Sequence, residues 1–211
     1  MKKSLTVFLA LSLMFIFSNS YSQSIETSSH NSDNSSTLSL NAKKSYGYWE
    51  ITPMGGVLFP VTSMSENFEI SARAGLDITY RVNREVGIYG NFAYNMLTSK
   101  ASTTPNASYL SYTVGPRYYF TNPKLKSTLF LEAGVGGYTF TQDAYTTTDP
   151  QGVNTNFPAA GDTRFGFNAG IGGDVYLSDN VSLMLKTKYN VILGDNTNSF
   201  IGVDGGVNIR F

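Results

Sequence analysis

The stretch FEISARAGLDITYRV, residues 68–82, alternates strictly between two kinds of side chain. Its even positions are all apolar or aromatic, and the odd positions between them carry glycine, hydroxyl or charged side chains, among them Glu69, Arg73, Asp77 and Arg81. Successive side chains of a β-strand point to opposite faces, so one face of this segment is uncharged and the other is ionic. A helix would scatter both sets around its cylinder. The segment is therefore predicted to be a strand.

Seven further segments follow the same period of two: residues 49–59, 86–96, 110–120, 129–135, 165–177, 181–193 and 201–211. Their connections alternate in length. Those after the second, fourth and sixth strands are short (83–85, 121–126, 178–180), and those after the first, third, fifth and seventh are mostly longer (60–67, 97–109, 141–163, 194–200). Short turns at one end and longer loops at the other are typical of outer-membrane barrels. The predicted fold is all-β: an eight-stranded antiparallel up-and-down transmembrane β-barrel.

The two faces of these strands predict which side meets lipid. The apolar faces of all eight segments lack Lys, Arg, Asp and Glu, and a Lys or Arg facing mid-membrane costs roughly 2–4 kcal/mol. A soluble barrel would have the opposite sidedness, with its apolar faces inside. We therefore expect the uncharged faces to meet outer-membrane lipid and the ionic faces to point into the barrel.

The inward set contains nearly equal numbers of cationic and anionic side chains. An eight-stranded barrel has room inside only for its own side chains, and removing one partner of a buried ion pair costs about 3–5 kcal/mol. We expect a salt-bridge network that plugs the lumen, formed by Glu50, Glu69, Arg73, Asp77, Arg81, Arg117, Glu132, Arg164, Asp174, Lys186, Lys188, Asp204 and Arg210. A charged pore is the alternative interpretation. Glycine runs at 133–137, 169–173 and 205–206 are interpreted as space for neighbouring inward side chains.

The N-terminus predicts export. Lys2 and Lys3 precede an apolar run at residues 5–17, and the small residues Ser20 and Ser22 stand before a plausible cleavage point at Gln23. This is the layout of a secretory signal peptide, and the run is shorter than the about 20 residues of a spanning helix. The expected organisation is a signal peptide at 1–22, a disordered Ser/Asn-rich leader at 23–45 and an outer-membrane β-barrel at 46–211.

Several function classes find no support in the composition. The chain has no cysteine, a formal net charge of zero and one histidine, so no thiolate metal site, nucleic-acid partner or cofactor is expected. That histidine, His30, falls in the leader, where no structure would orient it for proton transfer. No catalytic residue, cofactor-binding residue or metal ligand is therefore predicted, and the chain is not expected to be an enzyme.

Three stretches together, YTVGPRYYF (112–120), LFLEAGVGG (129–137) and the terminal NIRF (208–211), resemble the eight-stranded outer-membrane barrels of OmpA and OmpX type. The resemblance covers residues 46–211. It implies a monomeric or weakly associating barrel that the outer-membrane assembly machinery inserts, with the terminal Phe211 as the aromatic residue that this machinery reads. It implies no single activity.

The favoured function is that of a structural or surface-interaction protein, which meets an unidentified surface ligand through its extracellular loops. The longest loop, 141–163, is the expected contact region, in particular Tyr145, Thr146, Thr147, Thr148 and Asp149. The same residues could instead form only a mobile polar loop. The alternative function is a pore for small solutes.

Overall fold

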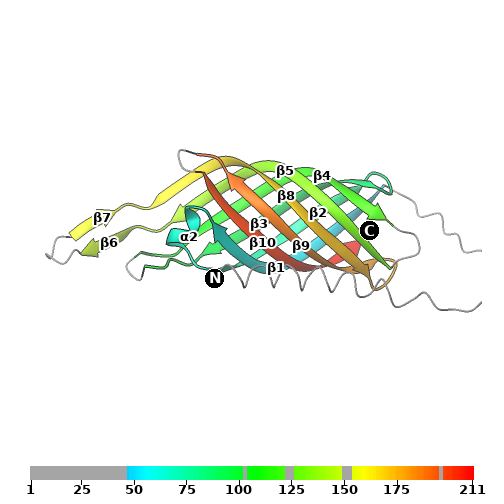
Figure 1. Cartoon of the computed structure of the whole chain (residues 1–211), viewed down its shortest axis with the longest axis horizontal. Coiled ribbons are helices and arrows are strands. Elements are labelled where there is room, and N and C mark those ends of the chain that lie inside the picture. Colours follow the sequence, from blue (N-terminus) through cyan, green and yellow to red (C-terminus); the bar gives the residue numbers. More distant parts are fainter. Residues whose placement is uncertain (1–46, 102–103, 122–125, 149–153, 195–196) are drawn as a thin grey trace, which may run out of the picture. The chain divides into compact units, whose positions relative to one another are not determined.

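The computed structural model describes residues 47–101, 104–121, 126–148, 154–194 and 197–211. Eight antiparallel strands close into a barrel (Figure 1): β1 (Tyr48–Val61), β2 (Ser71–Arg81), β3 (Val86–Leu97), β4 (Ala107–Thr121), β5 (Ser127–Gln142), β8 (Ala160–Tyr176), β9 (Val181–Ile192) and β10 (Asn198–Arg210). Each strand pairs with the next barrel strand along the chain, and β1 pairs with β10 to complete the ring. The predicted fold is confirmed. The predicted signal peptide (1–22) and leader (23–45) lie outside the described residues.

The burial of the strands follows the period of two seen in the sequence. In β2, Arg73, Asp77 and Arg81 are buried. The outward side chains keep much of their surface exposed, for example Ile78 at 41% and Phe92 at 52%. Since this exposed outer face is apolar and uncharged, it is suited to contact with hydrocarbon, and the ionic faces line the lumen.

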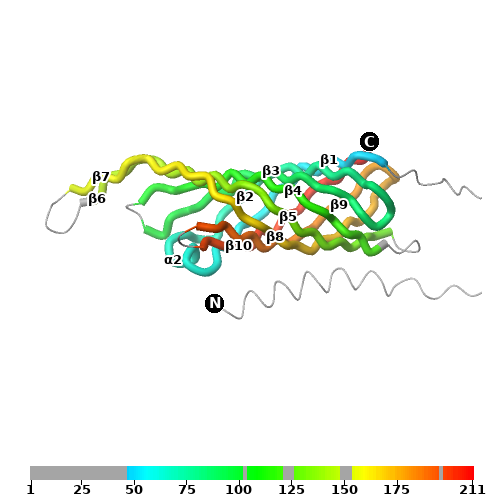
Figure 2. The backbone as a smooth tube through the Cα atoms, turned by 90° about the horizontal axis from the view of Figure 1, so that it is seen from above, coloured from blue at the N-terminus to red at the C-terminus, as the bar shows by residue number. Residues whose placement is uncertain are grey.

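The two ends of the barrel differ. The connections between β2 and β3, β4 and β5, and β8 and β9 are short and share one end, which we call the short-turn end. The other end, the long-loop end, carries the short helix α2 (Met64–Asn67) and the strands β6 (Tyr145–Thr148) and β7 (Asn154–Phe157). β6 and β7 form a two-stranded sheet of their own that projects beyond the barrel rim (Figures 1 and 2). None of the described residues forms a helix long and apolar enough to cross a membrane.

Several strand boundaries depart from the prediction: β4, β8 and β10 begin three to five residues earlier than predicted, and β2 and β5 differ for reasons visible in the structure. β2 begins at Ser71, because the chain before it is held in the loop, where Phe68 bridges to Ser99 and the Glu69 N–H donates to the Thr98 carbonyl at 2.9 Å. β5 continues beyond the predicted end at residue 135 to Gln142. Two glycines after Val135 hide the alternation in the sequence, although the inward phase resumes at Tyr138. The predicted 141–163 loop is thus partly strand.

Two inward glycines face large inward side chains. A Cβ built on Gly172 would lie 2.4 Å from the Phe130 ring, and one on Gly202 would lie 1.8 Å from the Arg73 guanidinium. A side chain at either position would displace its neighbour, because interiors are close-packed. This agrees with the interpretation of the glycine run 169–173 as space for inward side chains.

Candidate functional site: the lumen and the long-loop end

Five charged side chains from four strands meet in the middle of the lumen, and we call them the central cluster: Asp77 of β2, Arg117 of β4, Glu132 of β5, and Lys186 and Lys188 of β9. The Arg117 guanidinium lies 2.7 Å from Asp77 Oδ2 and donates from Nε to Glu132 Oε2 at 2.8 Å. Lys186 Nζ contacts Asp77 Oδ2 at 2.5 Å, and Lys188 Nζ contacts Glu132 Oε1 at 2.9 Å. The cluster therefore holds three cations with two carboxylates.

Two separate ion pairs flank this cluster. Arg73 Nε lies 3.0 Å from Asp204 Oδ1, on the side of the long-loop end. Arg210 Nη2 lies 3.3 Å from Glu50 Oε1, at the short-turn end. The predicted charged residues of the lumen are thus divided among several groups along the barrel axis.

Two predicted members of the network are buried but make other contacts. The Arg81 guanidinium stacks over the Tyr119 ring at 3.3 Å from its centroid and donates to the Tyr48 hydroxyl at 3.3 Å. Asp174 is 3% exposed, and within the described part of the chain no Lys or Arg lies within ion-pair distance of it. The lumen at the short-turn end is therefore polar, with aromatic rings between its charges.

The remaining two members lie at the long-loop end, outside the lumen network. Glu69 is exposed, because β2 starts two residues later and the chain before Ser71 does not keep the alternating orientation of a strand. Its placement in the lumen network was wrong. Arg164 is partly exposed at the rim, where its Nε donates to Asp162 Oδ2 at 2.6 Å. Asp162 was missed, although it stands two residues from Arg164 and so shares its face.

A cluster of buried apolar and aromatic side chains lies inside the barrel near the long-loop end, and we call it the apolar plug: Leu58, Met64, Leu97, Ala107, Tyr109, Tyr138, Ile192 and Phe200. Leu58, Leu97 and Phe200 are each 0% exposed. Met64 reaches the plug from α2, so this helix covers the end of the lumen. The plug was not among the features predicted from the sequence. Its members share the inward phase of the charged residues, and following that phase to the strand ends would have found most of them.

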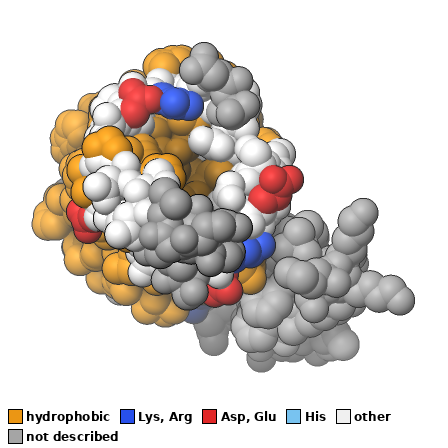
Figure 3. All heavy atoms as spheres, turned by 90° about the vertical axis from the view of Figure 1, so that its left-hand side faces the viewer, with side chains coloured by type: hydrophobic (Ala, Val, Ile, Leu, Met, Phe, Trp, Pro, Cys, Tyr) orange, Lys and Arg blue, Asp and Glu red, His pale blue; other side chains and the backbone are white. Residues whose placement is uncertain are grey.

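A pocket of about 340 Å³ opens at the rim above the plug, and we call it the rim pocket. Its lining comes from the loop around α2 and from four strands: Ser63, Met64, Asn67, Phe68, Tyr109, Phe140, Asp162, Arg164 and Asn198. Figure 3 looks onto this end, where hydrophobic side chains line a hollow and charged groups stand on the rim. The pocket joins half-buried aromatic rings to the Asp162–Arg164 ion pair.

The predicted contact loop forms the projecting hairpin. Tyr145, Thr146, Thr147 and Thr148 make up β6, whereas Asp149 lies outside the described residues. The Tyr145 and Phe157 rings stack at 4.7 Å between centroids, with 12° between their planes. The Thr146 hydroxyl donates to Asn156 Oδ1 at 2.7 Å. The hairpin therefore has internal contacts that give it a defined shape.

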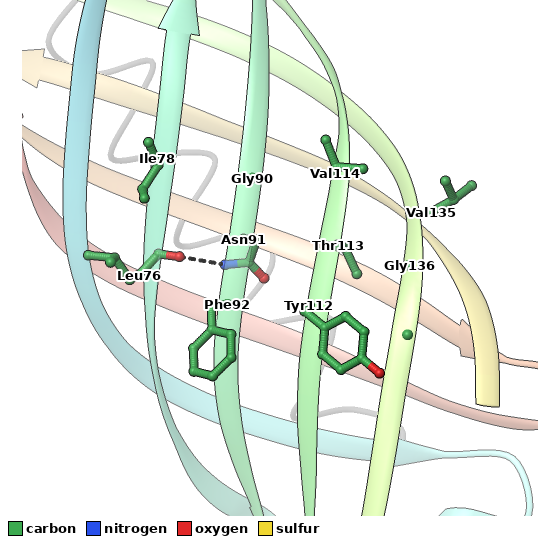
Figure 4. A pocket seen from close by; sticks show the side chains of 11 residues that line it. Leu76, Ile78, Gly90, Asn91, Phe92, Tyr112, Thr113, Val114, Val135 and Gly136 are labelled. Atoms are coloured by element: carbon green, nitrogen blue, oxygen red, sulfur yellow. Dashed lines mark hydrogen bonds between the residues drawn. The ribbon is translucent and has the colours of Figure 1, made fainter. Parts of the chain in front are cut away.

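The outer wall has a shallow depression of about 500 Å³, drawn in Figure 4. Leu76, Ile78, Phe92, Tyr112 and Val114 surround it, and glycines at 90, 136 and 137 leave room beside them. Its position on the apolar outer face places it against hydrocarbon in a bilayer. Phe211, the predicted assembly signal, is also on this face and 71% exposed, and its N–H donates to the Trp49 carbonyl at 2.9 Å.

The described residues contain no cluster of three or more Asp, Glu, His or Cys side chains placed to hold a metal ion.

Comparison with solved structures identifies the class of fold. Neisserial surface protein A matches with a TM-score of 0.60 and 14% identity, covering 77% of this chain and 97% of that one. Ail, the attachment invasion locus protein of Yersinia pestis, matches with a TM-score of 0.52 and 16% identity over 79% of this chain and 100% of that one. OprG from Pseudomonas aeruginosa matches with a TM-score of 0.52 and 13% identity over 79% and 96%.

These matches establish the fold and nothing finer. The chain is an eight-stranded β-barrel of the outer-membrane type, and the resemblance to OmpA- and OmpX-type barrels is confirmed at this level. No protein-family model matches the sequence, and no curated protein is similar to it. What the barrel does must therefore be argued from its own residues.

Proposed function

We propose that this protein is a surface-interaction protein of the outer membrane, in which a closed barrel holds the long-loop end where it meets ligands outside the cell. One observation carries the proposal: within the described residues, the elements added to the barrel are at one end. The three connections at the short-turn end are brief, whereas the long-loop end carries α2, the rim pocket and the projecting hairpin. Binding residues concentrate on loops held by a rigid scaffold.

The route to the membrane is part of the proposal. A signal peptide at residues 1–22 exports the chain, and the assembly machinery inserts the barrel through the exposed terminal Phe211. Neisserial surface protein A and the attachment invasion locus protein are, by name, proteins of cell surfaces and attachment. They support a surface role for a barrel of this shape. The barrel is proposed to act as a monomer, without a cofactor and without catalytic activity.

Deletion of the hairpin tests the surface role. β6 pairs only with β7, so replacing residues 145–157 by a short Gly-Ser linker should leave the barrel intact. The folded fraction is measured by gel migration with and without boiling, and binding by retention of whole cells on host-cell or matrix surfaces. We expect normal folding and loss of binding. Normal folding with full binding would remove the hairpin as the contact region, and a collapsed barrel would make it structural.

A small-solute pore is the competing function. The charged residues along the lumen favour it, whereas the buried apolar plug and the buried ion pairs favour a closed barrel. Planar-bilayer recordings of the refolded barrel distinguish the two. We expect no stable conductance steps from the wild type or from Arg73→Ala. Steady steps in the wild type whose size changes in Arg73→Ala would establish transport instead.

A further inference from the structure

The rim pocket has two kinds of wall. Phe68 and Phe140 are partly buried and supply ring surface, and the buried Tyr109 ring supports Phe140 at 5.1 Å between centroids. Asp162 and Arg164 supply a carboxylate and a guanidinium. Sites for small molecules combine apolar walls with a few placed polar groups in this way, and about 340 Å³ is at the lower end of their usual volume.

The barrel register places these walls side by side. Phe140 of β5 stands directly opposite Tyr109 of β4 on one side and Asp162 of β8 on the other. Arg164 follows on the same face of β8, two residues from Asp162. Two aromatic side chains and a charged pair thus lie next to one another on three neighbouring strands, on the rigid barrel rather than on a free loop.

The opposite wall is also held in place. The Asn198 amide donates to the Tyr109 hydroxyl at 3.3 Å, which links β10 to β4 across the pocket. The segment around α2 is tied to the β3–β4 connection, since the Lys100 N–H donates to the Asn67 carbonyl at 2.9 Å and Lys100 Nζ donates to the Ser65 carbonyl. A site that is formed before the ligand arrives loses less entropy on binding.

Charge limits what the pocket can accept. Asp162 and Arg164 form an ion pair at 2.6 Å and so largely cancel each other's field. The other described charges in the loops of this end are Glu66, Glu69, Asp143 and Lys100, which leaves the surroundings acidic. A polyanion would be repelled, and a lone charge would find no uncompensated partner within the pocket. The pocket therefore suits a neutral ligand.

We propose that the rim pocket binds a neutral saccharide, at the scale of one or two sugar rings. A pyranose has a face of C–H groups, which stacks on aromatic rings such as Phe68 and Phe140. Its edge carries hydroxyls, which both donate and accept, and Asp162, Arg164 and the amides of Asn67 and Asn198 offer the matching partners. The inference rests on the proposed surface role, which it deepens by naming a class of ligand.

The experiment is a titration of the full chain in detergent micelles with methyl glycosides of neutral hexoses and with neutral disaccharides. Saturation-transfer NMR detects the contact, and calorimetry gives the affinity. We expect saturable binding of at least one neutral saccharide. Phe140→Ala should weaken it by about tenfold or more, since it removes a stacking wall, and Asp162→Ala should do the same by removing a hydroxyl partner.

The control is Phe165→Ala. This residue is also an aromatic on a barrel strand near the long-loop end, but its side chain is outward and 58% exposed. Its loss should leave the affinity unchanged. Each variant is first shown to migrate as a folded barrel without boiling, so that a loss of binding is not a loss of structure.

Three outcomes would overturn the inference. The first is no saturable binding of any neutral saccharide, and the second is that Phe165→Ala weakens the binding as much as Phe140→Ala does. The third is that a sulfated saccharide or a free amino acid binds more tightly than the neutral saccharides. These results do not depend on the hairpin deletion. If that deletion abolishes cell binding while the titration detects no sugar binding, the surface role stands and the proposed saccharide site is wrong. If sugars bind and cells still adhere without the hairpin, the saccharide site stands and only the hairpin is removed as the contact region.

Discussion

The central cluster and the apolar plug fill neighbouring parts of one lumen by opposite means. In the central cluster, five charged side chains satisfy one another at exposures of 2% or less. In the plug, Leu58, Leu97 and Phe200 are buried against other apolar groups. The difference shows that the inward face of a barrel strand is not defined by polarity. One layer is stabilised by ion pairs and the next by apolar packing.

The two layers should respond differently to substitution. A charge that loses its partner stays buried without compensation, whereas an apolar group that is truncated leaves a cavity. The central cluster also carries one more cation than carboxylate. It should therefore be more sensitive to the loss of a carboxylate than to the loss of a cation.

The largest effect is expected for Asp77→Asn. Asp77 accepts from Arg117, Lys186 and the Asn91 amide, and its neutralisation leaves Glu132 alone with three cations. The free energy of unfolding, measured by urea titration in lipid vesicles, should fall by about 3–5 kcal/mol. Adding Lys186→Met to Asp77→Asn restores the original excess of one cation and should recover at least half of the loss. If the double variant is the less stable of the two, the charge balance does not govern this layer.

Truncation in the plug should cost less. Leu58→Ala is expected to lower the free energy of unfolding by about 2–3 kcal/mol, in the lower part of the range for buried leucines, because the loops at this end can partly fill the cavity. Leu131→Ala is the control: its side chain is outward and 45% exposed, so only a lipid contact changes. Equal losses in the two variants, measured by the same titration, would show that the plug is not tightly packed.

The barrel could be predicted from the sequence because the alternation of side chains follows from a physical constraint and is repeated in every strand. Each strand must keep charge away from lipid, so the alternation in residues 68–82 had to recur around the ring. The prediction was weakest where this constraint ends. Glu69 keeps the alternating pattern of the sequence, but it lies before the start of the strand. There a side chain reaches water whichever way it points.

The candidate site was harder to predict from the sequence. The central cluster forms because inward residues of different strands lie at the same level along the barrel axis. The barrel register sets these levels, and the period of two in the sequence does not reveal the register. The rim pocket joins Phe68, Tyr109, Phe140 and Asn198 from distant parts of the chain. Only the Asp162–Arg164 pair is local, and the predicted strand began just after it.

Between the two layers, a glycine on β10 tests how closely the lumen is packed. Gly202→Ala would place a methyl group 1.8 Å from the present position of Arg73 Nη1, so the guanidinium must shift away from Asp204. We expect a loss of about 1–3 kcal/mol in the free energy of unfolding. Gly205→Ala on the same strand has its nearest neighbour 4.0 Å away and faces outward, so it should be neutral. A neutral Gly202→Ala would show that Arg73 has room to move.

The smallest effect is expected at the rim, and it bears on what the rim is for. Asp162 and Arg164 form an ion pair like those of the central cluster, but their side chains are 54% and 32% exposed. Exposed ion pairs contribute about 0–1 kcal/mol, so Asp162→Asn should leave the urea midpoint nearly unchanged. A loss as large as that of Asp77→Asn would place the pair among the structural contacts of the barrel. A small loss, combined with weaker sugar binding in Asp162→Ala, would mean that the rim pair serves the pocket rather than the fold.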